Sequence, residues 1–139
     1  MEKDDVDRWL AAYVEAWKTY DRAQIAALFA DDVSYRYHPY DEPVRGRDAV
    51  VETWLGGGDD PDPAPRDEAG TYDAGYRAIA VDDDIAVAIG TSSYSPTPGA
   101  APDKVFHNCF VMRFDSGGRC REFTEWYIQQ PESQPAPPA

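Results

Sequence analysis

A carboxylate, Glu125, stands in the middle of an aromatic segment near the C-terminal end of the chain, within EFTEWYI. Alternate residues of a strand share a face, so Glu125 would lie beside Phe123 and Tyr127. On an outer face such a glutamate is simply solvated. In the wall of an apolar cavity it would be desolvated, its pKa would rise, and it could act as a general acid or base. A buried glutamate that pairs with a tyrosine or an arginine is the structural alternative.

Three other residues have side chains suited to proton transfer or hydrogen bonding. Tyr13 lies in an aromatic helical stripe, and its hydroxyl needs a partner if it is buried. Tyr37 ends a predicted strand, where tyrosines often line a core. His38 follows it before a proline, and histidine titrates near neutral pH. The alternatives are satisfied core tyrosines and an exposed loop histidine.

We expect no metal ion and no cofactor. By strand alternation His107 faces away from the side on which Glu125 is expected, which favours a role on the sheet surface or at an interface. The spacing of His107, Asp41 and Glu42 is not that of a metal site. Cys109 and Cys120 also lack such spacing, and strand cysteines are most often reduced and buried. The glycines at 56–58 follow no strand and precede no helix, so they are not a phosphate-binding loop.

Composition narrows the class of protein. The 139 residues are 42% hydrophobic, enough for one domain with one core. The formal charge of −13 argues against nucleic acid and against an anionic membrane surface. The N-terminus lacks a basic region followed by an apolar run, and no segment is long enough to span a bilayer. We therefore expect a cytoplasmic domain at 1–130 with a Pro-rich disordered tail at 131–139.

Periodicity predicts the elements that position these residues. Apolar residues at helical spacing predict helices over 4–20, 22–29 and 48–55, with Asp4 or Asp5 capping the first and Asp21 the second. Strands are predicted over 33–37, 71–81 and 85–95, and a final hairpin over 104–130 that turns at 115–118. Residues 56–70 are rich in Gly, Pro and Asp, which predicts a flexible surface loop that could form a lid.

Helices segregated from an antiparallel sheet indicate the α+β class. We expect a cone-shaped α+β barrel, in which three N-terminal helices pack on a strongly curved, mixed but mainly antiparallel sheet. A conical space would remain between the sheet and the first helix.

Four short stretches, in this order, resemble the nuclear transport factor 2-like superfamily, which includes SnoaL-like and ketosteroid isomerase-like proteins. They are YVEAW at 13–17, LFADDV at 28–33, VRGRDAV at 44–50, and FVMRFD at 110–115 continuing to Glu125-Trp126. The resemblance covers residues 4–130. It implies a small-molecule pocket between the concave sheet face and the first helix, with walls formed by Tyr13, Trp17, Tyr35, Tyr37, Trp54, Asn108, Phe110, Met112, Phe123, Glu125 and Tyr127.

The resemblance also suggests roles for some of these residues. Tyr13 falls where ketosteroid isomerases keep the tyrosine that hydrogen-bonds a substrate oxyanion. Their general-base aspartate falls on Tyr37 or His38, and their second oxyanion acid falls on Phe110, so we do not predict steroid isomerisation. Glu125 falls where limonene epoxide hydrolase-like proteins carry an acidic residue, but their partner Arg and Asp have no match in residues 85–95.

These observations support two hypotheses about function. The first is a cofactor-independent acid/base enzyme (an isomerase, cyclase, dehydratase or hydrolase) acting on a small apolar or polyketide- or terpenoid-like metabolite. Glu125 or His38 would move the proton, while Tyr13 and Tyr37 would hold an oxyanion. The second is a non-catalytic ligand-binding or dimerisation module. On either hypothesis we expect a homodimer through the outer sheet face, formed by His107, Cys109, Val111, Thr124 and Trp126.

Overall fold

The computed structural model describes residues 1–56 and 69–131. Three helices and six strands follow one another in these residues. They are α1 (Lys3–Thr19), α2 (Arg22–Ala27), β1 (Phe29–Arg36), β2 (Val44–Arg45), α3 (Arg47–Trp54), β3 (Tyr72–Asp82), β4 (Ile85–Tyr94), β5 (Lys104–Phe114) and β6 (Cys120–Gln129).

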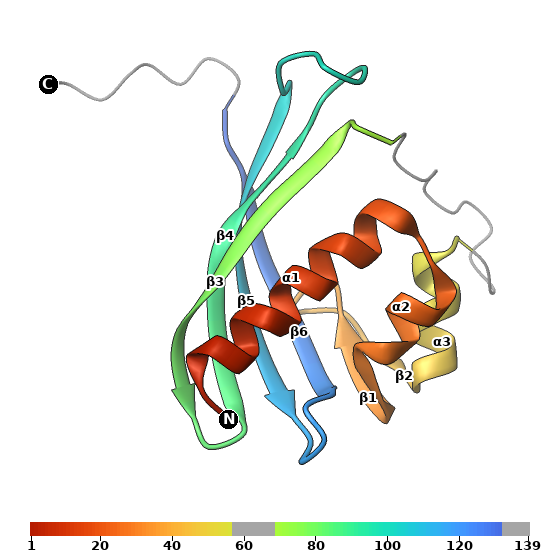
Figure 1. Cartoon of the computed structure of the whole chain (residues 1–139), viewed down its shortest axis with the longest axis vertical. Helices are drawn as coiled ribbons and strands as arrows, with labels where there is room; N and C mark the ends of the chain where they lie inside the picture. Colours follow the sequence, from red (N-terminus) through yellow and green to blue (C-terminus); the bar gives the residue numbers. More distant parts are fainter. Residues whose placement is uncertain (57–68, 132–139) are drawn as a thin grey trace, which may run out of the picture.

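The six strands form one sheet in the order β2-β1-β6-β5-β4-β3. Neighbouring strands are antiparallel except for β1 and β6, which run parallel. Figure 1 shows a curled, open sheet with α1 lying across one face and with α2 and α3 near the β1–β2 edge. This arrangement confirms the predicted α+β cone with a mixed, mainly antiparallel sheet.

Two boundaries differ from the sequence prediction by two residues or more. The second helix ends at Ala27, and Phe29 belongs to β1, which starts four residues before the predicted Val33. Phe29 pairs with Cys120 of β6, and the Leu28 carbonyl accepts from the Cys120 N–H at 2.9 Å, so strand pairing overrides the helical pattern. The short strand β2 was not predicted, because two residues carry no periodic signal.

The helix caps are partly as predicted. Asp21 caps α2, where its Oδ1 accepts from the Gln24 N–H at 2.9 Å. The prediction for α1 was wrong, since its N-cap residue is Glu2 rather than Asp4 or Asp5. Asp5 instead accepts from the Glu2 N–H at 2.9 Å, and so supports the first turn from inside the helix.

Most of the loop predicted at 56–70 and most of the tail predicted from 131 lie outside the described residues. Within the part of the chain that is described, no helix is long and apolar enough to cross a membrane. The cytoplasmic location stays a prediction.

The helix α1 is held against the rest of the fold by its aromatic stripe and by hydrogen bonds that involve Trp9 and Asp7. Trp9 and Tyr13 are buried and stack with ring centroids 5.4 Å apart. The Trp9 Nε1–H donates to the Leu28 carbonyl at 2.9 Å, and Asp7 Oδ1 accepts from the Ala78 N–H at 2.7 Å. Ala78 borders an irregularity in the β3–β4 register, so Asp7 pairs a backbone group where the strand is distorted.

The β5–β6 hairpin has the two faces that alternation predicts. Phe110 and Met112 of β5 are fully buried and lie opposite Glu125 and Phe123 of β6. Trp126, on the other face of β6, is 44% exposed. Glu125 therefore faces the interior with the core residues, and the solvated outer face is excluded as its location.

Small residues on the inner face of β4 leave room for the tyrosines of β3. Ala86 and Ala88 are fully buried, and Gly90 lies directly opposite Tyr76. A Cβ atom at Gly90 would lie 2.0 Å from the Gly75 carbonyl oxygen and 2.5 Å from Tyr76 Cδ1. Position 90 therefore has no space for a side chain.

Replacing Gly90 by alanine should destabilise the protein by about 2 kcal/mol or more, because the backbone of Gly75 and Tyr76 would have to move. Gly75→Ala is the matched control, since a Cβ there meets nothing within 4 Å. Urea unfolding of both variants measures the difference. Equal free energies of unfolding for the two variants would show that the close approach at Gly90 is relieved at little cost.

Candidate active site

A cavity of about 200 Å³ lies between α1 and the inner face of the sheet. Its lining side chains are mainly aromatic and polar but uncharged, with one carboxylate among them. They come from α1, β1 and the four long strands that follow, with Tyr37 just beyond the end of β1: Tyr13, Trp17, Tyr35, Tyr37, Tyr72, Tyr76, Ser92, Tyr94, Asn108 and Glu125.

Glu125 is the carboxylate in this wall. Asn108 on the neighbouring strand donates from Nδ2 to Glu125 Oε2 at 2.7 Å. Ser92 Oγ donates to Asn108 Oδ1 at 3.2 Å, which fixes the orientation of the buried amide. This chain of bonds from β4 through β5 to β6 holds the carboxyl group at one position in the wall.

The surroundings of Glu125 raise its pKa to about 7. Desolvation by burial is the main cause, while the Asn108 hydrogen bond and the nearby His38 act in the opposite direction. Desolvation is the larger effect because aromatic side chains replace water around the carboxyl group. A carboxyl group with this pKa can both accept and donate a proton near neutral pH.

Tyr13 and Tyr35 form a buried hydroxyl pair, with 3.4 Å between the two oxygen atoms. Burial is the largest cause that raises both pKa values well above the ordinary tyrosine value. Both phenols therefore stay neutral. Tyr35 stacks on Phe123 with ring centroids 4.6 Å apart, which fixes its ring in the cavity wall.

The remaining tyrosines extend this neutral hydrogen-bonding surface. Burial raises the pKa values of Tyr37 and Tyr76 to about 12, and the Tyr37 hydroxyl lies 3.0 Å from Thr53 Oγ1. Tyr76 hydrogen-bonds both Ser92 and Tyr72. The wall can thus offer several O–H donors to a ligand oxygen without placing a cation next to it.

His38 lies outside the cavity wall, at the start of the loop after β1. Its Nδ1 is 2.9 Å from Asp41 Oδ2, and its Nε2 is 2.7 Å from the Tyr127 hydroxyl. Tyr127 and Glu125 both line an outer groove of about 530 Å³. The groove and the inner cavity share four lining residues, Ser92, Tyr94, Asn108 and Glu125.

The predicted site residues divide into three groups in the structure. Those that line the inner cavity are Tyr13, Trp17, Tyr35, Tyr37, Asn108 and Glu125. His38 and Tyr127 contact each other beside the outer groove. Trp54, Phe110, Met112 and Phe123 are buried in the core and are not among the lining residues of the cavity.

The core position of Trp54 follows from its stacking on Trp17, with ring centroids 3.8 Å apart and an interplanar angle of 13°. Phe110 similarly contacts the rings of Tyr13 and Tyr76. These two core side chains fix the position of lining side chains. Their predicted role in substrate binding stays a prediction.

Four lining residues were missed from sequence: Tyr72, Tyr76, Ser92 and Tyr94. A signal for them exists in the two-residue period of β3 and β4. Tyr72 and Tyr76 lie four residues apart on one face of β3, and Ser92 continues the small residues on the inner face of β4. Tyrosines opposite small residues indicate rings that fill the space over a neighbouring strand.

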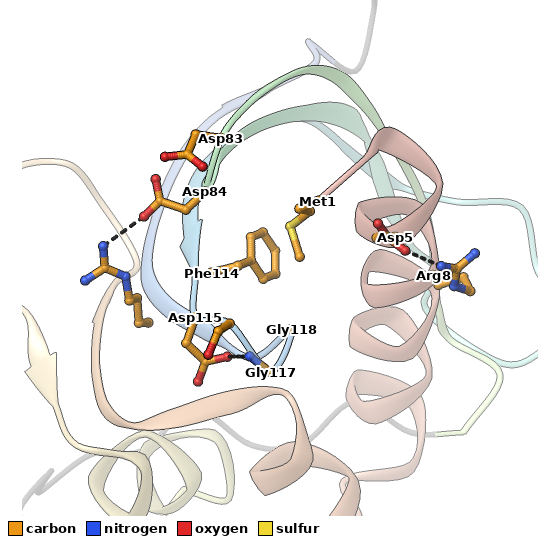
Figure 2. Close-up of a pocket in the computed structure, with 11 residues that line it drawn as sticks. Met1, Asp5, Arg8, Asp83, Asp84, Phe114, Asp115, Gly117 and Gly118 are labelled. Carbon is orange, nitrogen blue, oxygen red and sulfur yellow. Dashed lines mark hydrogen bonds and ion pairs between the residues drawn. The ribbon is translucent and has the colours of Figure 1, made fainter.

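A more open hollow of about 940 Å³ lies at the other end of the sheet, near the start of α1 and the hairpin turns. Figure 2 shows Met1 and Phe114 within it and charged side chains around it. Asp84 pairs with Arg121 at 2.9 Å, and Asp5 pairs with Arg8. None of the predicted site residues lines this hollow. The Asp84–Arg121 pair links the β3–β4 turn to β6, whereas Asp5 and Arg8 both belong to α1.

Comparisons with known proteins agree with this architecture. Three helices on a curled, mixed sheet define the cone fold of the nuclear transport factor 2-like superfamily, as the sequence resemblance predicted. The chain belongs to the SnoaL-like domain family, whose model matches residues 10–123. No curated protein sequence matches it.

Among solved structures, the chain is similar to a protein from Kribbella flavida DSM 17836 that is described as a "putative ketosteroid isomerase". The two chains superpose with a TM-score of 0.60 at 19% sequence identity, over 99% of this chain and 85% of the other. At this identity the likeness supports the shared fold.

The raised pKa of Glu125 predicts how stability depends on pH. Between about pH 4.5 and 7 the folded protein keeps the Glu125 proton while the unfolded chain loses it, so this group lowers stability as pH rises. Glu125→Gln removes the ionisation and keeps an acceptor for Asn108. The variant should gain up to about 3 kcal/mol relative to wild type over this pH range, as measured by urea unfolding. Parallel curves for the two proteins would contradict a desolvated carboxyl group.

Proposed function

We propose that this protein is a cofactor-independent acid/base enzyme in which Glu125 exchanges a proton with a small, oxygen-bearing molecule. One observation carries the proposal: a carboxyl group with its pKa raised to about 7 lies in the wall of a cavity lined by neutral hydroxyl groups. A group poised near neutral pH suits general acid/base catalysis, because both of its protonation states are well populated.

The chemistry that fits this arrangement is removal of a proton from a carbon next to a carbonyl group. The Glu125 carboxylate accepts the proton, and negative charge develops on the carbonyl oxygen. Tyr13 and Tyr35 are buried, neutral and adjacent, so their O–H groups can donate to that oxygen. Return of the proton to another carbon completes an isomerisation.

The size and composition of the cavity support a class of ligand. Its volume of about 200 Å³ lies below the roughly 300–1,000 Å³ usual for drug-sized ligands. Aromatic walls favour a ring or another apolar body, and the surrounding hydroxyls favour one or two oxygen atoms on it. A small cyclic ketone, or a fragment of a polyketide- or terpenoid-like metabolite, meets both requirements.

The second candidate function is a non-catalytic ligand-binding module. The observation in its favour is that Trp54 and Phe110 are packed in the core and restrict the cavity to a small volume. In that case Glu125 would serve to hydrogen-bond a ligand without moving its proton. The two functions differ in whether substrate protons exchange with solvent.

Hydrogen–deuterium exchange tests the proposal directly. Cyclohexanone in D₂O should exchange its α-hydrogens faster with the wild-type protein than in buffer, as followed by proton NMR. The rate should rise with pH through about 7, since the carboxylate is the active form. Glu125→Gln should reduce the protein-dependent rate by about 100-fold or more.

Glu122→Gln is the matched control for this experiment. Glu122 lies on the same strand but on the outer face, where it pairs with Arg113 at 3.2 Å. The control should exchange substrate as wild type does. Binding of cyclohexanone without any protein-dependent exchange would favour the binding module instead.

We further propose that two copies associate through the outer face of the sheet. Trp126 and Ile128 are 44% and 75% exposed there, and they line a shallow, mostly apolar hollow that also includes His107 and Cys109. None of the residues lining this hollow is acidic, although the chain carries 26 acidic residues. This face therefore lets two strongly acidic chains meet with little repulsion.

Light scattering tests the association. We expect twice the chain mass of 15.5 kDa for wild type and a shift toward the single-chain mass for Trp126→Glu. A wild-type mass of 15.5 kDa at micromolar concentration would contradict the dimer.

A further inference from the structure

Asp41, His38 and Tyr127 form a continuous hydrogen-bonded chain beside the outer groove. Asp41 Oδ2 lies 2.9 Å from His38 Nδ1 and also accepts from the His38 backbone N–H at 3.1 Å. On the other side of the ring, His38 Nε2 lies 2.7 Å from the Tyr127 hydroxyl. The ring of Tyr40 stacks on His38 with centroids 5.1 Å apart. The imidazole is thus held from three sides.

This geometry defines what each nitrogen of His38 does. An ionised carboxylate only accepts hydrogen bonds, so Nδ1 carries a proton toward Asp41. Nε2 is then the nitrogen that exchanges a proton with Tyr127. When both ring nitrogens carry a proton, Nε2 donates to the phenol oxygen.

The Tyr127 end of this hydrogen-bonded series lies close to Glu125. Tyr127 is two residues from Glu125 on the same face of β6, and Asn108 lies directly opposite Tyr127 on β5. Tyr127 and Glu125 both line the outer groove, while Glu125 also lines the inner cavity. A ligand that crosses from the cavity into the groove would meet Glu125 first and Tyr127 next.

We propose that Tyr127, supported by His38 and Asp41, is a second proton-transfer group that protonates a substrate oxygen while Glu125 removes a proton from carbon. This inference rests on the proposed role of Glu125 and extends it to a reaction class. One carboxyl group suffices for an isomerisation, in which the same proton leaves and returns. Two separate groups suit elimination of water from a β-hydroxy ketone.

The steps of such an elimination balance as follows. The α C–H bond breaks, its proton passes to Glu125, and its electron pair forms the new C=C bond. The bond from the β-carbon to its hydroxyl oxygen breaks, and that oxygen takes the Tyr127 proton and leaves as water. His38 Nε2 returns a proton to Tyr127. The His38 side chain is 33% exposed, so solvent can protonate the ring again, and Glu125 releases its proton through the groove.

A single probe compound separates the two proton transfers. 3-Hydroxycyclohexanone can exchange its α-hydrogens with D₂O, which requires Glu125 alone. It can also lose water to give cyclohexenone, which absorbs in the ultraviolet and which requires Tyr127 as well. Exchange is measured by NMR and elimination by absorbance, on the same samples of full-length protein.

We expect Tyr127→Phe to keep the exchange rate within a few-fold of wild type and to reduce elimination by about 100-fold. His38→Gln should behave in the same way, and Glu125→Gln should lose both reactions. Glu122→Gln is the matched control, because Glu122 lies on the same strand as Tyr127 but on the outer face, where it pairs with Arg113. It should leave both rates unchanged.

This experiment distinguishes a failure of the role proposed for Tyr127 from a failure of the role proposed for Glu125. Equal effects of Tyr127→Phe on exchange and elimination, or no effect on either, would overturn the role of Tyr127 and leave Glu125 in place. Wild-type protein that exchanges the α-hydrogens without eliminating water would do the same. Wild-type protein that catalyses neither reaction would overturn both.

Asp41 is a positioning residue in this proposal, and it has a readout that does not depend on activity. In wild type, the ¹⁵N chemical shifts of neutral His38 should show the tautomer with hydrogen on Nδ1. Asp41→Asn should give a mixture of tautomers and should reduce elimination more than exchange. An unchanged tautomer in Asp41→Asn would show that the carboxylate does not set the proton position.

Discussion

The parallel pairing of β1 with β6 is the constraint on which the candidate site depends. It places Tyr35 opposite Phe123, two positions that are far apart in the chain. Because the pairing is parallel, the C-terminal ends of both strands emerge at the same edge of the sheet. Tyr37, His38 and Asp41 follow the end of one strand, and Glu125 and Tyr127 belong to the same end of the other. Without this pairing the two halves of the site would not meet.

Within the site, Glu125 is the side chain whose burial carries a desolvation cost. Aromatic neighbours exclude water from its carboxyl group, and the hydrogen bond from Asn108 compensates only part of the lost solvation. The core that surrounds it is otherwise well packed, with Phe110, Met112 and Phe123 fully buried. Functional sites often contain a destabilising feature such as this buried carboxyl group, and the rest of the fold is stable enough to keep it. The sheet supports this cost, because β5 and β6, which carry Asn108 and Glu125, pair continuously from Phe106 to Arg113.

Sequence patterns predicted what depends on local periodicity. The two faces of the final hairpin followed from strand alternation, whereas the inward direction of Glu125 and the position of Tyr13 across from it came from the family resemblance. The tyrosines of β3 were missed because Tyr72 and Tyr76 reach the site through the β3–β4 register, and because Gly90, which has no side chain, leaves room for Tyr76. The link from Asp41 to Tyr127 was also missed, since contact between a loop and a strand 89 residues later than His38 has no periodic signal.

The position of β6 between β1 and β5 has a consequence for how the chain acquires its structure. This internal strand is the last element of the described chain to be synthesised, yet β1 pairs only with it and with the two residues of β2. Until β6 is available, β1 has a largely unpaired edge, and α1 has only part of the sheet to cover. During synthesis the N-terminal half therefore cannot form a finished unit, and non-local pairing of this kind slows folding. The domain is expected to complete its core in one late step that also assembles the site.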